Sequence, residues 1–511
     1  MPDVAPFLED AAHSPGGHAA GIAFPRTVDE VADAVRSAIC VLPIGAQSSL
    51  TGGATPMGEL IVATTRLTGI LDETPTSLTV QAGVTVAAMQ EHLAARGAWF
   101  PPAPTFTGAC AGGIVATNAA GAATFKYGST RDWVEALTVV LADGSVVRVR
   151  RGETVATGGY LELARRRVPV PRYTMPAVVK RSAGYYAAED MDAVDLFVGS
   201  EGTLGVVVDV TFRVLAPAPA SALALVFCSS EAQGIALAAA LRNASLTTRR
   251  SGDPAGVDVA AIEHMDRRCI EILIEDGAAA RENVAVPPGA EMVLLVQLEL
   301  PKALPAEAAY EQIAMALTTG ALDTPLVRFC RLLDDAGLLG STELAMPGDH
   351  GRIEQLLRIR EAVPAGVNHR VGVAKRTIDG RIAKTAADMV VPFEHFVEMN
   401  AIYRRGFESR GLDYAIWGHI SDGNVHPNVI PRSFEDVEKG YDAILEFGRE
   451  VARLDGCPLA EHGVGRNPVK QALLHQLYGD DGIEQMRAVK RALDPESKLA
   501  PGVIFPAIMS A

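Results

Sequence analysis

The stretch Pro43-Ile-Gly-Ala-Gln-Ser-Ser-Leu-Thr-Gly-Gly53 decides the fold of the N-terminal part of the chain. It continues the apolar run that begins at Val41, which is typical of a short buried strand. Its glycines leave backbone N–H groups accessible and its Ser and Thr side chains add hydroxyls, a combination that suits a pyrophosphate. An ordinary loop between strands is the alternative, since the stretch has neither the G-x-G-x-x-G fingerprint nor a P-loop lysine. The residues expected to line a phosphate-bearing cofactor here are Pro43, Gly45, Ala46, Gln47, Ser48, Ser49, Thr51, Gly52 and Gly53.

Two further stretches are equally rich in small residues. They are Pro104-Thr-Phe-Thr-Gly-Ala-Cys-Ala-Gly-Gly-Ile-Val-Ala-Thr-Asn-Ala-Ala-Gly121 and Gly199-Ser-Glu-Gly-Thr-Leu-Gly205. Backbone without bulky side chains can approach a ligand closely. Three such loops in one domain therefore indicate a large, extended cofactor that lies against main chain. The candidate contacts in these two stretches are Thr107, Gly112, Gly113, Thr117, Asn118, Gly121, Glu201, Gly202 and Gly205.

Secondary-structure signals around the loops indicate an α+β protein. Thr27-Val-Asp-Glu30 is a capping box that opens an amphipathic helix. Strands are predicted at residues 60–63, 78–82, 137–141 and 146–149, and this first domain extends to about residue 215. After Ala216-Pro-Ala-Pro219, strands at 223–227, 257–262 and 292–300 alternate with helices at 231–242 and 307–317. The second part is therefore expected to be an antiparallel sheet covered by helices.

Two histidines of the C-terminal half flank an Asp-Gly pair in Trp417-Gly-His-Ile-Ser-Asp-Gly-Asn-Val-His-Pro427. A two-residue Asp-Gly turn would place His419 and His426 directly opposite each other, where Cβ atoms lie roughly 4.5–5.5 Å apart. Two such imidazoles could share a cation, and Glu461 could supply a third ligand. Two His and one Glu leave a coordination position open, as catalytic divalent-metal sites do. For each histidine alone a structural role is the alternative, because strand histidines and Asp-Gly turns are common.

The composition is that of an acidic globular protein. The chain has 511 residues, and its net charge of −15 argues against a nucleic-acid partner. Apolar residues make up 48% and charged residues 21%, which is ample for large buried cores in two or three domains. The six cysteines are scattered without a C-x-x-C pair, so they are expected to be reduced thiols rather than disulfides or cluster ligands.

No targeting or membrane signal is evident. The N-terminus, Met1-Pro-Asp-Val-Ala-Pro, lacks a basic segment followed by an apolar core. Apolar runs such as Met292-Val-Leu-Leu-Val296 end long before the roughly 20 residues that a transmembrane helix needs. The sequence therefore predicts a cytoplasmic protein without a transmembrane segment.

Taken together, these motifs resemble those of the FAD-linked D-2-hydroxyacid dehydrogenases, a branch of the vanillyl-alcohol-oxidase flavoproteins. The branch includes D-lactate dehydrogenase, the glycolate oxidase D subunit and D-2-hydroxyglutarate dehydrogenase. The resemblance rests on the stretches at residues 43–53, 112–121, 127–132, 195–205, 418–427 and 461–465. They occur in the same order and extend over nearly the whole chain.

The resemblance implies the fold and the cofactor. The fold class is α+β, with a vanillyl-alcohol-oxidase-type (PCMH-type) FAD-binding domain of two α+β subdomains at residues 1–216. An α+β cap domain with an antiparallel sheet covered by helices follows at residues 217–470, and residues 471–511 return to the flavin domain. The FAD pyrophosphate is expected at residues 45–53, which contain no His or Cys, so the FAD is expected to be non-covalent.

The resemblance also implies a reaction, the oxidation of a small D-2-hydroxy acid to the 2-oxo acid by hydride transfer to flavin N5. The acid would be lactate-like, or glycolate or D-2-hydroxyglutarate. His419, His426 and Glu461 match metal ligands of relatives, with Zn²⁺ as the expected ion and Mn²⁺ as the alternative. His462 matches the active-site base, and Arg360 matches an arginine whose fork binds the substrate carboxylate.

The chain departs from the family pattern where relatives bind a second carboxylate. Those relatives place a lysine two residues before the position of Asp388, and this chain has Ala386 there. Lys384 is shifted by two residues. Together with Arg370 it belongs to a basic segment, residues 368–384, which is expected either to recognise an anion differently or to be a solvated loop. The identity of the acid therefore stays open.

The missing dinucleotide fingerprint disfavours a nicotinamide partner, so electrons are expected to leave to a quinone, a cytochrome or an electron-transferring flavoprotein. A membrane-bound acceptor would place the protein at the membrane periphery. Two alternatives stay open, a flavin oxidase that uses O₂ and a flavin-binding subunit of a multi-subunit glycolate-oxidase-like complex. The oligomeric state, including a homodimer, is likewise open.

Overall fold

A computed structural model describes residues 3–102, 104–301 and 304–506. The chain divides into two compact units. Unit 1 comprises residues 1–121, 128–218 and 455–511, and unit 2 comprises residues 122–127 and 219–454. No sequence pattern predicts that residues 122–127 belong to unit 2.

The chain returns to unit 1 earlier than predicted. The expected change from cap domain to C-terminal segment lies at residues 470 and 471, whereas the observed change falls between Leu454 and Asp455. The reason is that the intervening residues bond to unit 1, for example through the Ser182 N–H, which donates to Leu459 O at 2.9 Å. Residues 507–511 of the predicted segment lie outside the described residues.

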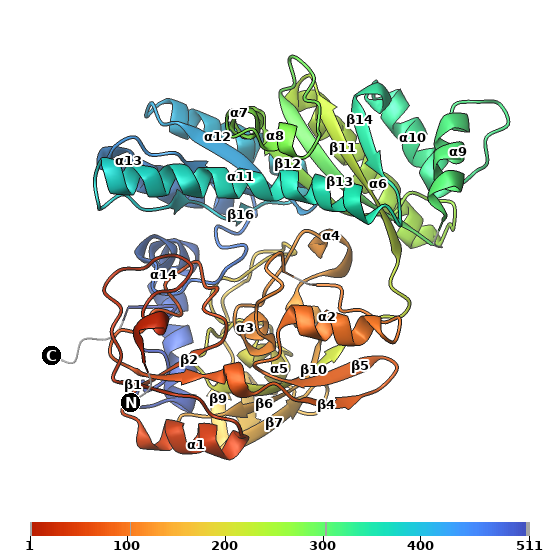
Figure 1. Ribbon diagram of the computed structural model, residues 1–511. Coiled ribbons are helices and arrows are strands. Elements are labelled where there is room, and N and C mark those ends of the chain that lie inside the picture. The colour runs from red at the N-terminus through yellow and green to blue at the C-terminus, as the bar shows by residue number, and fades with distance from the viewer. Residues whose placement is uncertain (1–2, 103, 302–303, 507–511) are drawn as a thin grey trace. The chain divides into compact units, whose positions relative to one another are not determined.

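Unit 1 contains two main sheets (Figure 1). The parallel sheet has the order β1 (Gly21–Ala23), β3 (Leu60–Ala63), β2 (Val41–Ile44). The antiparallel sheet has the order β4 (Ile70–Glu73), β5 (Ser77–Gln81), β10 (Val206–Arg213), β6 (Val134–Val140), β7 (Val146–Arg150). Strands β8 (Tyr160–Leu163) and β9 (Arg166–Pro169) form a separate pair. The helices are α1 (Val28–Ser37), α2 (Val86–Ala94), α3 (Ala111–Ala116), α5 (Ala193–Phe197) and α14 (Pro468–Leu493), the last interrupted at Gly479.

Local sequence explains the elements of unit 1. The Thr27 hydroxyl accepts the Glu30 N–H and caps α1 as predicted, whereas the Glu30 carboxylate accepts the N–H of Arg26 and not that of Thr27. The four predicted strands correspond to β3, β5, β6 and β7. Gly144 supplies the positive φ of the turn between β6 and β7, 78°. These predictions are confirmed.

Unit 2 is built on one antiparallel sheet, as predicted. Its order is β14 (Thr342–Ala345), β11 (Ala220–Cys228), β13 (Met292–Leu300), β12 (Val259–Asp266), β17 (Tyr414–His419), β18 (Asn424–Val429), β15 (Thr385–Ala386), and β16 (Met389–Val390) also pairs with β18. The helices are α4 (Thr124–Tyr127), α6 (Glu231–Ser251), α7 (Arg267–Glu275), α8 (Ala278–Arg281), α9 (Ala306–Met315), α10 (Pro325–Asp335), α11 (His350–Thr377), α12 (Phe396–Glu408) and α13 (Phe434–Arg453).

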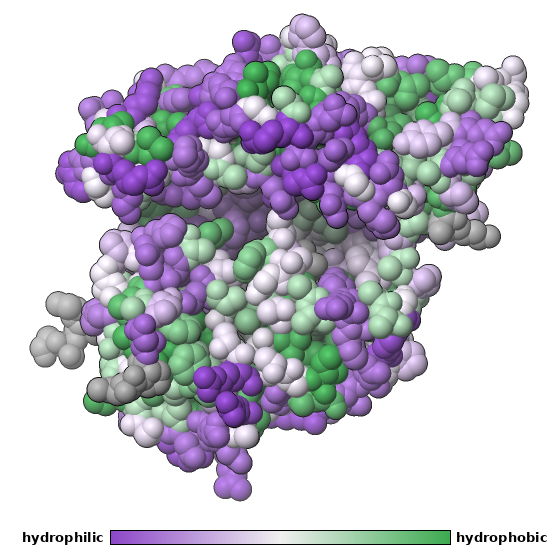
Figure 2. Space-filling model, in the orientation of Figure 1, coloured by the Kyte–Doolittle hydropathy of each residue, from purple (hydrophilic) through white to green (hydrophobic). Residues whose placement is uncertain are grey.

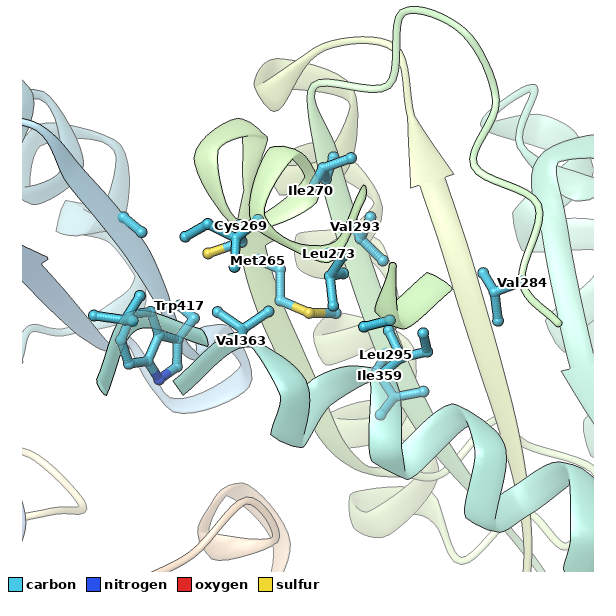
Figure 3. Close-up of a cluster of buried hydrophobic side chains, with 14 of the residues drawn as sticks. Met265, Cys269, Ile270, Leu273, Val284, Val293, Leu295, Ile359, Val363 and Trp417 are labelled. Atoms are coloured by element: carbon cyan, nitrogen blue, oxygen red, sulfur yellow. The ribbon is translucent and has the colours of Figure 1, made fainter. Parts of the chain in front are cut away.

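Helices cover both faces of this sheet. Figure 3 shows one face, where Ile359 and Val363 of α11 belong to a buried cluster with Met265 of β12 and Trp417 of β17. On the other face, the Phe396 ring of α12 meets His264 edge-on. Side chains two residues apart in a strand share a face. The packing of Met265 and Trp417 therefore also fixes Glu263 and His419, which belong to the candidate site.

Helix α4 attaches residues 122–127 to unit 2 through buried charges. Lys126 pairs with both Asp258 and Glu299. The Tyr127 hydroxyl donates to Glu299 at 2.6 Å, and Phe125 lies under Arg249 at 4.5 Å. Glu299 is only 4% exposed, so its charge depends on these partners.

No helix within the described ranges has the length and apolar composition that a bilayer crossing requires.

Replacing Lys126 with Met should destabilise unit 2, because it leaves two largely buried carboxylates without their shared cation. The expected loss is roughly 3 kcal/mol of unfolding free energy, somewhat moderated by Tyr127 and Arg249. Urea titration measures it, with Lys439→Met as control, because Lys439 pairs with Glu435 on the exposed surface of α13. Equal effects of the two substitutions would contradict the assignment.

Candidate active site

The loops predicted to bind the cofactor all lie in unit 1, and main-chain hydrogen bonds join two of them. The Gly199 N–H donates to Val115 O at 2.9 Å, and the Glu201 N–H donates to Ala116 O at 2.8 Å. These bonds hold the 199–205 loop against the end of α3. The same loop presses on β2, since a Cβ at Gly202 would lie 2.6 Å from the Pro43 ring.

The 45–53 loop is closed from within and contacts a segment near Glu461. The Ser49 hydroxyl accepts the N–H groups of Thr51 and Gly53. Thr51 O accepts the Arg466 N–H at 2.9 Å, and a Cβ at Gly465 would lie 2.2 Å from the Thr51 hydroxyl. Glycine is therefore required at 465, where φ is 58°. Residues 463–466 thus lie against the 45–53 loop. This segment and the loops at residues 45–53, 104–121 and 199–205 are called the loop cluster below.

Two adjacent glycines of α3 have different surroundings. A Cβ at Gly112 would lie 2.8 Å from the Ala82 Cβ, whereas one at Gly113 would meet no atom within 4 Å. One glycine therefore packs α3 onto the sheet, and its neighbour leaves main chain accessible to a ligand. Every residue predicted to hold FAD belongs to unit 1, where such backbone can accommodate a pyrophosphate and a planar ring.

Glu201 joins two loops of the cluster. Its two carboxylate oxygens accept the N–H groups of Val464, at 2.7 Å, and Gly465, at 2.8 Å. Burial raises the pKa of Glu201 to about 7, although these hydrogen bonds oppose the rise. Its backbone has a φ of 51°, a conformation that L-residues seldom adopt. The strained backbone and the raised pKa both mark a position fixed by its surroundings.

The two predicted metal-binding histidines lie on neighbouring strands of unit 2, but the prediction that they are directly opposite is wrong. His419 pairs with Asn424 rather than with His426. The reason is that the connection is longer than two residues: Ile420–Asp422 form a 3-10 helix, and Gly423 follows with a φ of 81°. The histidines are diagonal neighbours, which on one face remain within reach. Their ring centroids are 5.5 Å apart, and a ring nitrogen of each lies within 4.8 Å of the other.

A buried carboxylate, Glu263 of β12, lies beside His419. The two residues are direct partners in the β12–β17 ladder, and His419 Nδ1 is 2.5 Å from Glu263 Oε1. Arg360 of α11 donates from Nε to Glu263 Oε2 at 2.9 Å. Burial raises the pKa of Glu263, but the charge of Arg360 and the hydrogen bonds with Arg360 and His419 outweigh it and hold the pKa below its ordinary value. One carboxylate therefore contacts two predicted site residues.

His426 has a similar carboxylate neighbour. Its Nδ1 lies 3.4 Å from Oδ1 of Asp388, which is 5% exposed. The Asn424 amide donates to the same oxygen at 3.2 Å. Each histidine thus presents Nδ1 to a buried carboxylate, an arrangement common among metal-binding histidines, where Nε2 then serves as the ligand.

Glu461 and His462 belong to unit 1 and follow α13 and precede α14 along the chain. Lys180, whose side chain is fully buried, places Nζ 2.7 Å from Glu461 Oε1. Lys470 donates to Glu461 O and Gly463 O at 3.3 Å. The backbone of His462 has a φ of 67°, which is rare outside glycine and frequent at functional sites. The lysines and the unusual backbone fix how both side chains are presented.

The two residues predicted to bind a further anion have different surroundings. Residues 368–377 are the last turns of α11, not a loop, and the outer face of this helix is strongly hydrophilic (Figure 2). Arg370 pairs there with Glu275 and Asp276 of the α7 end. Lys384 is exposed and forms no ion pair with any residue in the described ranges. The Arg370 guanidinium is therefore engaged within the protein, whereas Lys384 has no acidic partner among the described residues and desolvation lowers the pKa of its ammonium group.

Three buried charged residues at the candidate site were not anticipated, namely Lys180, Glu263 and Asp388. Each lies far along the chain from at least one residue that it contacts, as Glu263 and His419 do, 156 positions apart. No motif surrounds Lys180 or Glu263, and Asp388 matches a family position for which no role was predicted. The only signal for Glu263 is a charge inside the apolar run Val259-Ala-Ala-Ile-Glu-His-Met265, which is unusual for a buried strand.

Glu201→Gln should destabilise unit 1, because an NH₂ group replaces one of the two accepting oxygens and faces a backbone N–H that it cannot accept; a loss of about 1–3 kcal/mol is expected. The loss should depend on pH. In the wild type the folded pKa of about 7 lies above the ordinary 4.5, so the folded state binds more protons between these values. Its unfolding free energy should therefore fall as pH rises through that range, a contribution that the variant lacks. Urea titrations across the range measure both slopes, with exposed Glu496→Gln as control, and equal slopes for wild type and Glu201→Gln would contradict the assignment.

Two family models match the chain. The FAD binding domain matches residues 19–150, within unit 1 and the α4 segment. The C-terminal domain of FAD linked oxidases matches residues 229–504, more than half of the chain.

Curated relatives match along nearly the full length. A D-2-hydroxyglutarate dehydrogenase of Xanthomonas citri pv. viticola is 29% identical, covering 95% of this chain and 89% of the relative. The glycolate oxidase subunit GlcD of Bacillus subtilis is 27% identical, with 94% and 88% covered. A D-lactate dehydrogenase of Archaeoglobus fulgidus is 27% identical, with 94% and 90% covered.

The fold has a counterpart among solved structures. An alkyldihydroxyacetonephosphate synthase superposes with a TM-score of 0.57 at 13% identity, covering 94% of this chain and 76% of the other. This likeness and the two family models confirm the predicted α+β FAD-binding fold. The chain belongs to the FAD-linked oxidases, and FAD is its cofactor.

Proposed function

We propose that this flavoenzyme oxidises a small D-2-hydroxy acid to the corresponding 2-oxo acid. The observation that carries the proposal is the set of Arg360, Glu263 and His419, in which a guanidinium and an imidazole share one buried carboxylate. A guanidinium suits a substrate carboxylate, and an oriented imidazole suits a metal ion. The names of the relatives, which are dehydrogenases or oxidases of such acids, support the same reaction.

A divalent metal is part of the proposal, with His419, His426 and Glu461 as its ligands. The support is chemical: both histidines present Nδ1 to buried carboxylates, which favours Nε2 as the ligand atom. Glu461 belongs to the other unit and enters as the third ligand by the sequence resemblance. Zn²⁺ is the expected ion and Mn²⁺ the alternative. When bound, such an ion lowers the pKa of the substrate hydroxyl.

The protein residues then have distinct tasks. Arg360 binds the substrate carboxylate and fixes which hydrogen of Cα is presented for transfer. His462 accepts the hydroxyl proton at a ring nitrogen, for which it must be neutral. FAD, when bound, takes up the hydride from Cα. Proton and hydride together account for the two hydrogens that the alcohol loses.

The part of the substrate beyond the 2-hydroxy acid is not set by these residues. Ala386 offers no charge, so a second carboxylate would need another partner, and exposed Lys384 suits it better than ion-paired Arg370. Electrons are proposed to leave to a quinone, a cytochrome or an electron-transferring flavoprotein.

The holoenzyme should be bleached by D-2-hydroxy acids. Under anaerobic conditions, the flavin band should fall on adding one or more D acids and stay constant with their L isomers. Prior treatment with a chelator should slow the bleaching. A yellow protein that no hydroxy acid reduces would refute the proposal, and rapid reoxidation in air would favour the oxidase alternative.

His462→Ala should slow flavin reduction on the order of 10²-fold or more, since a positioned base is lost. The visible spectrum of bound FAD and the metal content should stay as in the wild type. His475→Ala is the matched control, because His475 is an exposed histidine of α14 that bonds Asp480. Unchanged reduction by His462→Ala would place the base elsewhere.

A further inference from the structure

We propose that Glu263 is a positioning residue that couples substrate-carboxylate recognition at Arg360 to metal binding at His419. The inference rests on the proposed function and deepens it. Glu263 is 5% exposed, and each of its two oxygens serves a different site residue. A carboxylate shared in this way ties the two side chains together.

The first half of the coupling sets the tautomer of His419. An ionised carboxylate only accepts hydrogen bonds, so the Nδ1 that faces Glu263 Oε1 must carry the hydrogen. A neutral imidazole with hydrogen on Nδ1 has its lone pair on Nε2, which is the form that binds a cation. Glu263 therefore selects the ligating tautomer of His419.

The second half sets the orientation of Arg360. Its Nε edge donates to Glu263 Oε2, and its side chain is 15% exposed. Because the guanidinium is planar, fixing one edge fixes the plane of the whole fork. The fork geometry that would meet a substrate carboxylate is thus set by Glu263.

The sheet register makes the arrangement stiff. Glu263 pairs with His419, and two residues further along β12 Met265 pairs with Trp417 on the same face. Met265 and Trp417 lie in the buried cluster that also contains Val363 of α11 (Figure 3). Glu263 cannot follow a displaced partner without disturbing that packing, so a shift of either partner is transmitted to the other.

A purely structural ion pair that fastens α11 to the sheet is the competing explanation. It predicts that removing the Glu263 charge lowers stability and nothing else. The coupling predicts that metal affinity and substrate affinity both change in protein that remains folded. These two readouts separate the explanations.

The test uses the FAD-loaded enzyme and the isosteric substitution Glu263→Gln. A Gln that keeps Arg360 as its donor turns an NH₂ group toward His419 Nδ1, which favours the wrong tautomer. Zn²⁺ affinity, measured by competition with a chromophoric chelator, should fall about 10–100-fold. Because a neutral amide holds the Arg360 guanidinium less tightly than a carboxylate does, KM for the best D acid should in the same variant rise by more than kcat falls. The matched control is Glu299→Gln, a buried carboxylate of neighbouring β13 that pairs with Lys126; it should leave Zn²⁺ affinity unchanged.

The outcomes distinguish this inference from the proposed function. A wild type that binds no Zn²⁺ and oxidises no hydroxy acid overturns both. A wild type that does both, with Glu263→Gln equal to it in Zn²⁺ affinity and in KM, overturns the coupling alone. If Glu263→Gln does not fold, Glu263→Asp replaces it; the shorter side chain cannot reach both donors, so at least one of the two quantities must change, and constancy of both overturns the coupling.

Discussion

The pairing of β12 with β17 is the constraint on which the candidate site of unit 2 depends. This pairing places Glu263 beside His419. Two residues further along β12, it places Met265 beside Trp417. The apolar pair is buried in the cluster with α11, so the energy of the core fixes the position of the polar pair. A slip of one residue would send both pairs to the opposite face. Burial of Met265 and Trp417 thus fixes the positions of Glu263 and His419.

Unit 1 has a different constraint, because loops that leave main chain accessible must still be held in one conformation. Its small-residue loops have few side chains to pack, and they are held by hydrogen bonds between loops instead. Glu201 does this with its carboxylate, which bonds Val464 and Gly465. Burying an acid is unfavourable, and the raised pKa of Glu201 reflects that cost. The 463–466 segment is therefore bonded to a loop that is proposed to bind the cofactor, and it directly follows Glu461 and His462 in the chain.

Much of the fold could be predicted from the sequence, because apolar periodicity, helix caps and turn residues indicate strands and helices locally. The Thr27 cap, strand β13 and the antiparallel sheet of unit 2 all follow from periodicity and turn residues. The register of the β17–β18 hairpin could not, since Asp422-Gly423 is compatible with a two-residue turn and with the longer connection that forms. Nor could Glu263, Asp388 or Lys180, because their importance comes from contacts between distant residues.

The excursion of residues 122–127 makes unit 2 discontinuous in the gene. The continuous fragment 219–454 would lack Lys126 and Tyr127, and Glu299 would then lie inside it without two of its partners. Recombination only at the boundaries 218/219 and 454/455 would therefore yield a unit 2 that lacks Lys126 and Tyr127. Exchange of unit 2 between relatives, in evolution or in the laboratory, therefore has to include residues 122–127 of the FAD-binding sequence. The two units cannot diverge independently at these six residues.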